Sequence, residues 1–282
     1  MNCAWEPLIS LLPLWMREKV DMYRNRMLQE LRLRSGLPPE LVTGDGVFYL
    51  ERPITKQDLT YCVNVASRYS PWVAQTAASG YITAPGGHRI GLCGRAVMHG
   101  QTLHTVDDFT SLCIRVARDL PGIAVSAAKI PGSVLILGKP GNGKTTLLRD
   151  LIRCRSDLCG QAVAVADERE EIFPKHSGAF CFSTGKRVDI LSGCPKGEGV
   201  TNLLRTMSPD VIAVDEVTAR NDCDALISAG WCGVELLATA HADCVSALHK
   251  RPVYKPLLES GIFKTALVMR SDKSWKVESI CQ

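Results

Sequence analysis

The sequence predicts an α/β protein in which a smaller α+β domain precedes a domain built on a mostly parallel β-sheet. Two observations carry this prediction. Short apolar runs alternate with helical patterns in the second part of the chain, whereas short alternating segments and turn residues dominate the first part. Pro121-Gly122 and Pro131-Gly132 punctuate the chain before the pattern changes at residue 133, so we place the domains at residues 1–122 and 123–282. A chain of 282 residues is long enough for two modest domains.

The first domain is expected to combine helices with short strands. Polar and apolar residues mixed at helical spacing predict a helix over residues 14–30. Residues 55–79 form a second helical pattern, broken at Ser70-Pro71 because the residue before proline is disfavoured in a helix. Two short strands are expected around Gly44-Asp45-Gly46, where glycines permit a tight turn. The other predicted strands lie at residues 31–34, 81–83, 89–97, 103–106 and 112–116.

The second domain is expected to alternate strands with helices. Apolar runs predict buried strands at residues 133–137, 161–166, 210–214 and 235–239. Helical patterns lie near residues 145–155, 199–207 and 219–229. This alternation predicts a sheet with helices on both of its faces.

The glycine-rich segment at residues 138–145 lies between the first apolar run and the next helix. It fits the pattern G-x-x-x-x-G-K-[ST], which is called a P-loop. Its glycines let backbone N–H groups point at a phosphate, and the following helix presents its positive N-terminal end. Lys144 supplies charge to the outer phosphates, and the Thr145 hydroxyl is a ligand for Mg²⁺. A chance glycine loop is the alternative, and the strand–loop–helix context argues against it. The expected ligands are ATP and Mg²⁺, bound by Gly138, Lys139, Pro140, Gly141, Asn142, Gly143, Lys144, Thr145 and Thr146.

A second motif, Val211 to Glu216, places paired carboxylates at the end of a buried strand. If this strand neighbours that of the P-loop, Asp215 holds Mg²⁺ and Glu216 polarises the attacking water as general base. Acidic residues that merely cap a strand are the alternative. A small-molecule kinase would need an acceptor pocket and a lid, and the sequence gives no clear signal for either.

Two further groups are expected at the same edge of the sheet. The acidic stretch 167–171 begins where another strand ends, so Asp167 or Glu168 is expected to face the ligand crevice. Glu168 is the second candidate for positioning water, and a solvated helix start is the alternative. His241 follows the apolar run 235–239 and is a candidate γ-phosphate sensor, although a lone histidine is more often structural.

Several arginines are candidates for neutralising charge on the transferred phosphoryl group. Any single one is more often a surface or ion-paired residue. Together they fit a site that another domain or subunit completes. In the first domain they are Arg89, Arg95, Arg115 and Arg118, and in the second Arg187, Arg205 and Arg220.

Composition excludes several classes of protein. The net charge of +4, from 33 basic and 29 acidic residues, is too small to predict nucleic acid as a direct partner. No stretch of the sequence approaches the length of about 18 uninterrupted apolar residues that a membrane-spanning helix needs. The twelve cysteines contain no Cys-x-x-Cys pair, which disfavours structural zinc. With no export signal at the N-terminus, we expect reduced, mostly buried thiols in a cytoplasmic protein.

Motifs along nearly the whole chain combine in a way that few P-loop proteins share. They are ELRLR (30–34), GYIT (80–83), GHRIGL (87–92), IRVAR (114–118), the P-loop and DER (167–169). The most specific stretches are GCPKGEG (193–199) and RTMSPDVIAVDE (205–216). This combination resembles the stage III sporulation protein AA family, which is related to the type II and type IV secretion ATPases.

The resemblance implies a RecA-like P-loop ATPase domain behind the smaller N-terminal domain, assembled as a homo-hexamer. In the secretion relatives, Asp167 and Glu168 would fall in an acidic box and His241 in a histidine box. N-terminal arginines reach the phosphates there, which favours Arg89, Arg115 or Arg118. The implied partners are membrane proteins of a sporulation channel, which would hold the protein at a membrane on the mother-cell side.

The leading hypothesis is therefore an ATP-hydrolysing motor that powers transport between mother cell and forespore during endospore formation. Two alternatives remain open at this point. One is a nucleotide-binding scaffold of a membrane assembly, which Lys144 and Glu216 argue against. The other is a RecA-like ATPase stimulated by nucleic acid, which the small net charge argues against.

Overall fold

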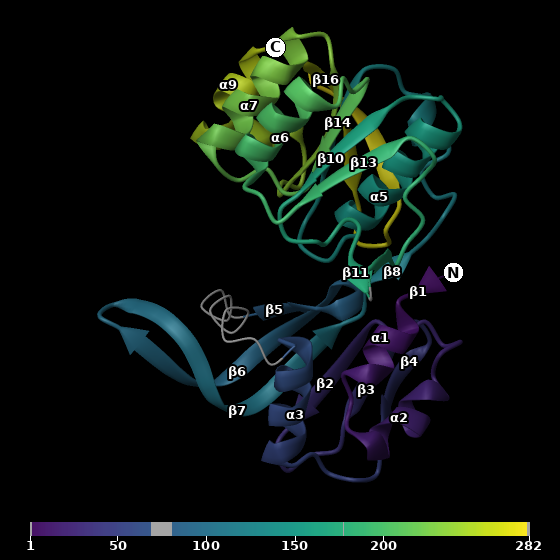
Figure 1. Ribbon diagram of the computed structural model, residues 1–282, viewed down its shortest axis with the longest axis vertical. Coiled ribbons are helices and arrows are strands. Elements are labelled where there is room, and N and C mark those ends of the chain that lie inside the picture. The colour runs from purple at the N-terminus through teal and green to yellow at the C-terminus, as the bar shows by residue number, and fades with distance from the viewer. Residues whose placement is uncertain (1, 69–80, 177, 281–282) are drawn as a thin grey trace. The chain divides into compact units, whose positions relative to one another are not determined.

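The computed structural model describes residues 2–68, 81–176 and 178–280. The chain forms two compact units (Figure 1). The N-terminal unit contains Asn2–Arg118 and Pro174–Phe182, and the C-terminal unit contains Asp119–Phe173 and Ser183–Gln282. The sequence predicted a boundary near residue 122. In the structure the N-terminal unit ends at Arg118, and residues 174–182 belong with it as well.

The N-terminal unit is built on a six-stranded antiparallel sheet in the order β4-β3-β2-β7-β6-β5. Its strands are β2 (Glu30–Arg34), β3 (Glu40–Thr43), β4 (Gly46–Tyr49), β5 (Tyr81–Ala84), β6 (His88–His99) and β7 (Thr102–Arg115). Its helices are α1 (Trp5–Ser10), α2 (Leu14–Asp21) and α3 (Lys56–Ala66). Short elements are β1 (Asn2–Cys3), η2 (Pro85–Gly87), β11 (Lys175–His176) and β12 (Ala179–Phe180), and β8 (Arg118–Asp119) lies at the boundary.

Local sequence explains much of this unit. Residues alternate in β2, so that Leu31 and Leu33 are buried in the core. Thr55 begins α3 with a capping box, because its hydroxyl accepts the Asp58 N–H and the Asp58 carboxylate accepts the Thr55 N–H. The strand predicted over 31–34 and the strand pair around 44–46 are confirmed.

Three expectations in this unit need correction or fall outside the described residues. The helix predicted over 14–30 ends at Asp21, and turns follow to residue 27. The two strands predicted over 103–106 and 112–116 form one continuous strand, β7. The helix predicted over 55–79 ends at Ala66, and the part of that prediction over 69–79 lies outside the described residues.

The C-terminal unit is built on a seven-stranded sheet in the order β13-β10-β14-β15-β9-β16-β17. Every neighbouring pair is parallel except β16 with β17. The strands are β9 (Ser133–Leu137), β10 (Val163–Asp167), β13 (Val188–Ser192), β14 (Val211–Val214), β15 (Glu235–Ala240), β16 (Phe263–Met269) and β17 (Trp275–Ser279). The helical elements are η3 (Ala127–Lys129), α5 (Lys144–Asp157), α6 (Lys196–Thr206), α7 (Arg220–Trp231), α8 (Val245–His249), η4 (Pro252–Tyr254) and α9 (Lys255–Glu259). The predicted parallel sheet is confirmed, whereas β13, β16 and β17 were not predicted.

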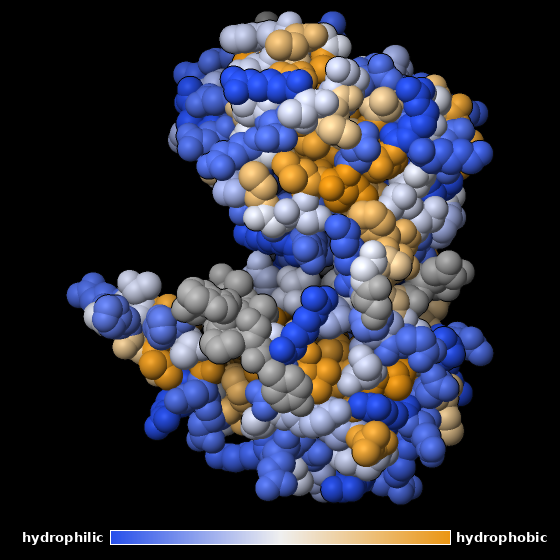
Figure 2. Space-filling view, viewed as in Figure 1, coloured by the Kyte–Doolittle hydropathy of each residue, from blue (hydrophilic) through white to orange (hydrophobic). Residues whose placement is uncertain are grey.

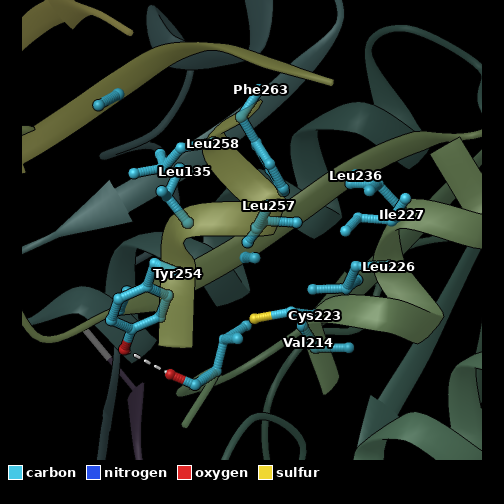
Figure 3. Close-up of a cluster of buried hydrophobic side chains, with 14 of the residues drawn as sticks. Leu135, Val214, Cys223, Leu226, Ile227, Leu236, Tyr254, Leu257, Leu258 and Phe263 are labelled. Atoms are coloured by element: carbon cyan, nitrogen blue, oxygen red, sulfur yellow. Dashed lines mark hydrogen bonds between the residues drawn. The ribbon is translucent and has the colours of Figure 1, made fainter. Parts of the chain in front are cut away.

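Hydrophobic cores cover both faces of this sheet. Leu135 and Leu137 of β9 belong to one core, and Val134 and Ile136 belong to the other. Alternate side chains of a strand point to opposite faces, so β9 is buried on both sides. Figure 3 shows part of the first core, where Leu257 and Leu258 of α9 lie beside Leu135. The Tyr254 hydroxyl there donates to the Val217 carbonyl at 2.7 Å.

The surface of each unit mixes polar and apolar residues. On the face drawn in Figure 2, hydrophilic side chains surround areas of hydrophobic ones. Within the described residues, no helix has the length and apolar character needed to cross a membrane. The side chains of ten cysteines are described, all as free thiols; Cys62, Cys154 and Cys223 are buried, and the others are half-buried or exposed. The expectation of mostly buried thiols was therefore wrong.

Candidate functional site

The glycine-rich loop connects β9 to α5, the context that its sequence predicts. Gly143 stands at the start of α5 with a φ of 92°, and Gly141 has a φ of 81°, both in the region that favours glycine. These two glycines let the chain turn sharply between strand and helix. The N-terminal end of α5, with its free N–H groups, is thereby available to an anion.

Lys144, the first residue of α5, folds its side chain back onto this loop. Its Nζ donates to the carbonyls of Gly138 at 2.9 Å and Lys139 at 3.1 Å. The side chain is buried, which lowers the pKa of the ammonium, while the nearby Asp215 and Glu216 carboxylates act in the opposite direction. The loop thus holds the lysine charge against backbone oxygens, and negatively charged phosphate oxygens would be stronger partners.

Asp215 contacts Thr145 although the strand before Asp215, β14, is not a neighbour of β9, the strand before the glycine-rich loop. We expected the two motifs to converge if β14 lay beside β9, but β15 lies between them. The Thr145 hydroxyl nevertheless donates to Asp215 Oδ2 at 2.5 Å. Asp215 Oδ1 accepts a hydrogen bond from the hydroxyl of Thr239, a residue of the intervening strand β15.

Glu216 has both carboxylate oxygens engaged. His241 Nε2 lies 2.8 Å from its Oε1, and Arg169 Nη1 lies 3.2 Å from its Oε2. Its φ is 51°, a conformation that a glutamate rarely adopts and that is concentrated at functional sites. Arg169 was not singled out from the sequence, and its place directly after Asp167 and Glu168 at a strand end was the available signal.

His241 links Lys144 to Glu216. Its Nδ1 lies 2.9 Å from Lys144 Nζ, and its Nε2 faces the Glu216 carboxylate. Because an ammonium only donates and a carboxylate only accepts, these partners select the neutral tautomer with its proton on Nε2. The histidine therefore connects the lysine of the glycine-rich loop with the candidate base.

Asp167 and Glu168 both line a small cavity together with Asp215 and Glu216, and each also has hydrogen-bond partners of its own. Asp167 is buried, and its carboxylate accepts the N–H groups of Glu171, Ile172 and Phe173 at 3.0, 3.3 and 2.9 Å. Burial raises the pKa of Asp167, and these hydrogen bonds partly oppose the rise. Glu168 pairs with Lys196 Nζ at 2.6 Å. Asp167 therefore shapes the loop that follows β10, and Glu168 is fixed by a buried lysine.

Two cavities border these carboxylates. One of about 20 Å³ is lined by residues that include Asp215 and Glu216, and this is room for one water molecule. The other is an open groove of about 830 Å³ bordered by α6, α7 and the turn at Glu168 and Arg169. The smaller cavity places a water-sized space against the candidate base.

Six of the seven predicted arginines have partners within their own units. In the N-terminal unit, Arg89 stacks 4.5 Å from the centre of the Tyr81 ring, and Arg115 lies 3.7 Å from Glu30. Arg118 donates to the Leu28 carbonyl, and Arg95 pairs with Asp107. In the C-terminal unit, Arg220 pairs with Asp224, Arg187 donates to the Gly160 carbonyl, and Arg205 borders the groove.

The donors of the site fit Mg²⁺ with a nucleotide better than a metal held by protein alone. Among the described residues, no cluster of three or more His, Cys, Asp or Glu side chains is arranged to hold a metal ion. One hydroxyl, from Thr145, and one carboxylate, from Asp215, converge beside a loop with a lysine. Mg²⁺ is commonly held by one or two protein ligands together with phosphate oxygens and water.

Sequence comparison assigns the chain to a family. The profile of the family described as "Sporulation stage III, protein AA" matches residues 9–281. The chain belongs to this family. Stage III sporulation protein AA of Bacillus subtilis (strain 168) is 36% identical over 256 residues, which cover 87% of this chain and 83% of that protein. The family resemblance expected from the motifs is confirmed.

Solved structures with the same fold include an ATPase and a pilus retraction motor. DotB of Yersinia pseudotuberculosis matches this chain with a TM-score of 0.61 at 14% identity, over 97% of this chain and 81% of that one. The pilus retraction motor PilT with bound ADP matches with a TM-score of 0.60 at 13% identity, over 90% and 77% of the two chains. The α/β fold with a parallel-rich sheet is therefore the fold of DotB and PilT.

Proposed function

We propose that this chain hydrolyses ATP with Mg²⁺ at the loop between β9 and α5. The observation that carries the proposal is the convergence of Lys144, Thr145, Asp215 and Glu216 at one edge of the sheet. Each of these side chains has the chemistry that one part of the reaction requires. The structural relatives are named as an ATPase and as a motor with bound ADP, which supports the same reading.

The residues divide the work as follows. Residues 138–146 hold the phosphates through backbone N–H groups, and Lys144 exchanges its carbonyl partners for phosphate oxygens. Thr145 and Asp215 would hold Mg²⁺, which would neutralise charge on the phosphates. Water attacks the γ-phosphorus as the bond to the β-phosphate oxygen breaks, and Glu216 accepts the proton of that water. His241 orients the Glu216 carboxylate through Nε2 and contacts the Lys144 ammonium through Nδ1.

The biological role proposed here is that of a motor for a sporulation apparatus. Family membership supports a role in sporulation stage III, and the likeness to the ATPase DotB supports ATP hydrolysis. We propose a homo-hexamer in which Arg89 or Arg115 reaches the phosphates, with channel proteins of the membrane as partners on the mother-cell side. Light scattering with and without a non-hydrolysable ATP analogue tests the ring, and a strict monomer in both conditions contradicts it.

A lysine substitution tests nucleotide binding and hydrolysis together. Lys144→Ala should abolish Mg²⁺-ATP hydrolysis and weaken binding of a fluorescent ATP analogue, because the phosphates lose their one buried ammonium from this loop. Lys255→Ala is the matched control, since Lys255 is exposed on α9. Hydrolysis that survives Lys144→Ala at the control rate would place the reaction elsewhere.

A further inference from the structure

Thr239 is a buried threonine whose hydroxyl faces both catalytic carboxylate residues from a neighbouring strand. It lies in β15, the strand that separates β14 from the P-loop strand β9, and it is fully buried. It belongs to none of the motifs found in the sequence. Its position nevertheless places one hydroxyl directly beneath the turn that carries Asp215 and Glu216.

The hydrogen-bond roles of this hydroxyl are fixed by its partners. A carboxylate only accepts, so Thr239 donates its single proton to Asp215 Oδ1. A backbone amide only donates, so the Thr239 oxygen accepts the N–H of Glu216 at 2.8 Å. The Thr239 carbonyl adds a third bond, because it accepts the N–H of Val217 at 2.9 Å.

These bonds constrain the two functional side chains in different ways. Asp215 has Oδ1 held by Thr239 and Oδ2 held by Thr145, so its carboxylate plane is fixed from both sides. Glu216 has a φ of 51°, which an L-amino acid adopts only when its surroundings compensate. The bonds from Thr239 to residues 216 and 217 supply that compensation and hold Glu216 toward His241.

We propose that Thr239 is a positioning residue that sets the orientation of the Mg²⁺ ligand Asp215 and of the base Glu216 through one hydroxyl. The proposal rests on the proposed ATP hydrolysis. It assigns no contact with nucleotide to Thr239. Substitution of Thr239 should therefore affect the Mg²⁺-dependent steps and leave Mg²⁺-independent binding of phosphates by residues 138–146 unchanged.

The experiment compares Thr239→Val with Thr239→Ser in the full chain. Valine keeps the shape and loses the donor and the acceptor, whereas serine keeps both. For valine we expect kcat to fall about 10- to 100-fold and the Mg²⁺ concentration for half-maximal rate to rise, as for loss of a partner of a metal ligand. Serine should stay within about threefold of the parent, given the same hydroxyl chemistry. Binding of fluorescent ADP without Mg²⁺ should be equal in all three proteins.

Thr43→Val provides the control for a lost buried hydroxyl bond. Thr43 is buried in the N-terminal unit, and its hydroxyl donates to Asp45 at 2.5 Å, so the variant should change stability without changing Mg²⁺ dependence. If Thr239→Val does not fold, Thr239→Cys replaces it, because a thiol is a weaker donor and acceptor and should give an intermediate effect. Unchanged kcat and Mg²⁺ dependence in the valine or cysteine variant would overturn the proposal, as would an equal loss in Thr239→Ser.

A failure of the proposed hydrolysis is distinguishable from a failure of this inference. If the parent protein releases no phosphate from ATP, the proposed function fails. The Mg²⁺-dependent gain in fluorescent ADP affinity is still measurable in that case. Loss of this gain in Thr239→Val, with the gain kept in Thr239→Ser, supports the role of the hydroxyl.

Discussion

His88 makes the stability of the N-terminal unit depend on pH. The side chain is fully buried, its Nε2 bonds the Ala4 carbonyl at 2.8 Å, and its Nδ1 accepts the Ala117 N–H at 3.2 Å. Burial lowers the pKa of His88 from 6.5 to about 4, despite the opposing bond to Ala4. A neutral imidazole satisfies both partners, whereas an imidazolium would lose the acceptor at Nδ1 and carry a buried charge.

The sign of the effect follows from proton binding. The unfolded chain binds a proton at His88 below pH 6.5 and the folded chain only below about pH 4, so stability falls as pH falls through this window. Across this whole pH window, His88 changes the free energy of unfolding by about 3 kcal/mol, of which about 2 kcal/mol is lost by pH 5. Above pH 6.5 the contribution is fully present and constant.

Hydrogen exchange with mass spectrometry measures this effect for the N-terminal unit separately. The parent protein, His88→Gln and the exposed control His99→Gln are compared from pH 7 to pH 4.5. Glutamine offers one donor and one acceptor in place of the two ring nitrogens, and it does not titrate. We expect the stability advantage of the parent over His88→Gln to shrink by about 2 kcal/mol by pH 5, and His99→Gln controls for the loss of a histidine from the surface. Parallel pH curves for the parent and His88→Gln would refute the reasoning.

Two further substitutions test how the chain is held near residues 167–182. Asp167→Ala removes the acceptor of three backbone N–H groups, so urea unfolding of the C-terminal unit should show a loss of more than about 2 kcal/mol, and an unchanged midpoint would contradict that role. Gly87→Ala would place a Cβ 2.7 Å from Pro174 Cγ at a φ of 75°. Proteolysis within residues 174–182 should therefore be faster than in Gly100→Ala, which has a positive φ but no close neighbour; equal rates would argue against the contact.

The part of the site that was predictable from sequence is the part encoded locally. The P-loop is a contiguous pattern, and its strand and helix flank it directly, so the amino-acid pattern alone places Lys144 and Thr145 at the start of a helix. Asp215 and Glu216 follow an apolar run, which marks a strand end. Their meeting with Thr145 depends on strand order, and sequence periodicity does not encode the insertion of β15 between β14 and β9.

Residues that act through tertiary contacts were missed. Thr239 is one threonine within an apolar strand, and only the fold shows which turn lies beside its hydroxyl. The sequence predicted that the Asp167 carboxylate faces a ligand because Asp167 ends a strand. In the structure this carboxylate accepts backbone N–H groups of the loop that follows, including that of Phe173. The helix predicted over 14–30 has no glycine or proline to mark its end at Asp21, so packing decides where it stops.

Glu216→Gln provides the most direct measurement of the central claim that this chain hydrolyses ATP at the described site. Glutamine keeps a partner for His241 and Arg169 but cannot accept the proton of water. Steady-state phosphate release with Mg²⁺ should be present in the parent and in the exposed control Glu259→Gln on α9. In Glu216→Gln it should fall by at least about 100-fold while ATP binding is kept. Phosphate release by Glu216→Gln at the parent rate would contradict the account.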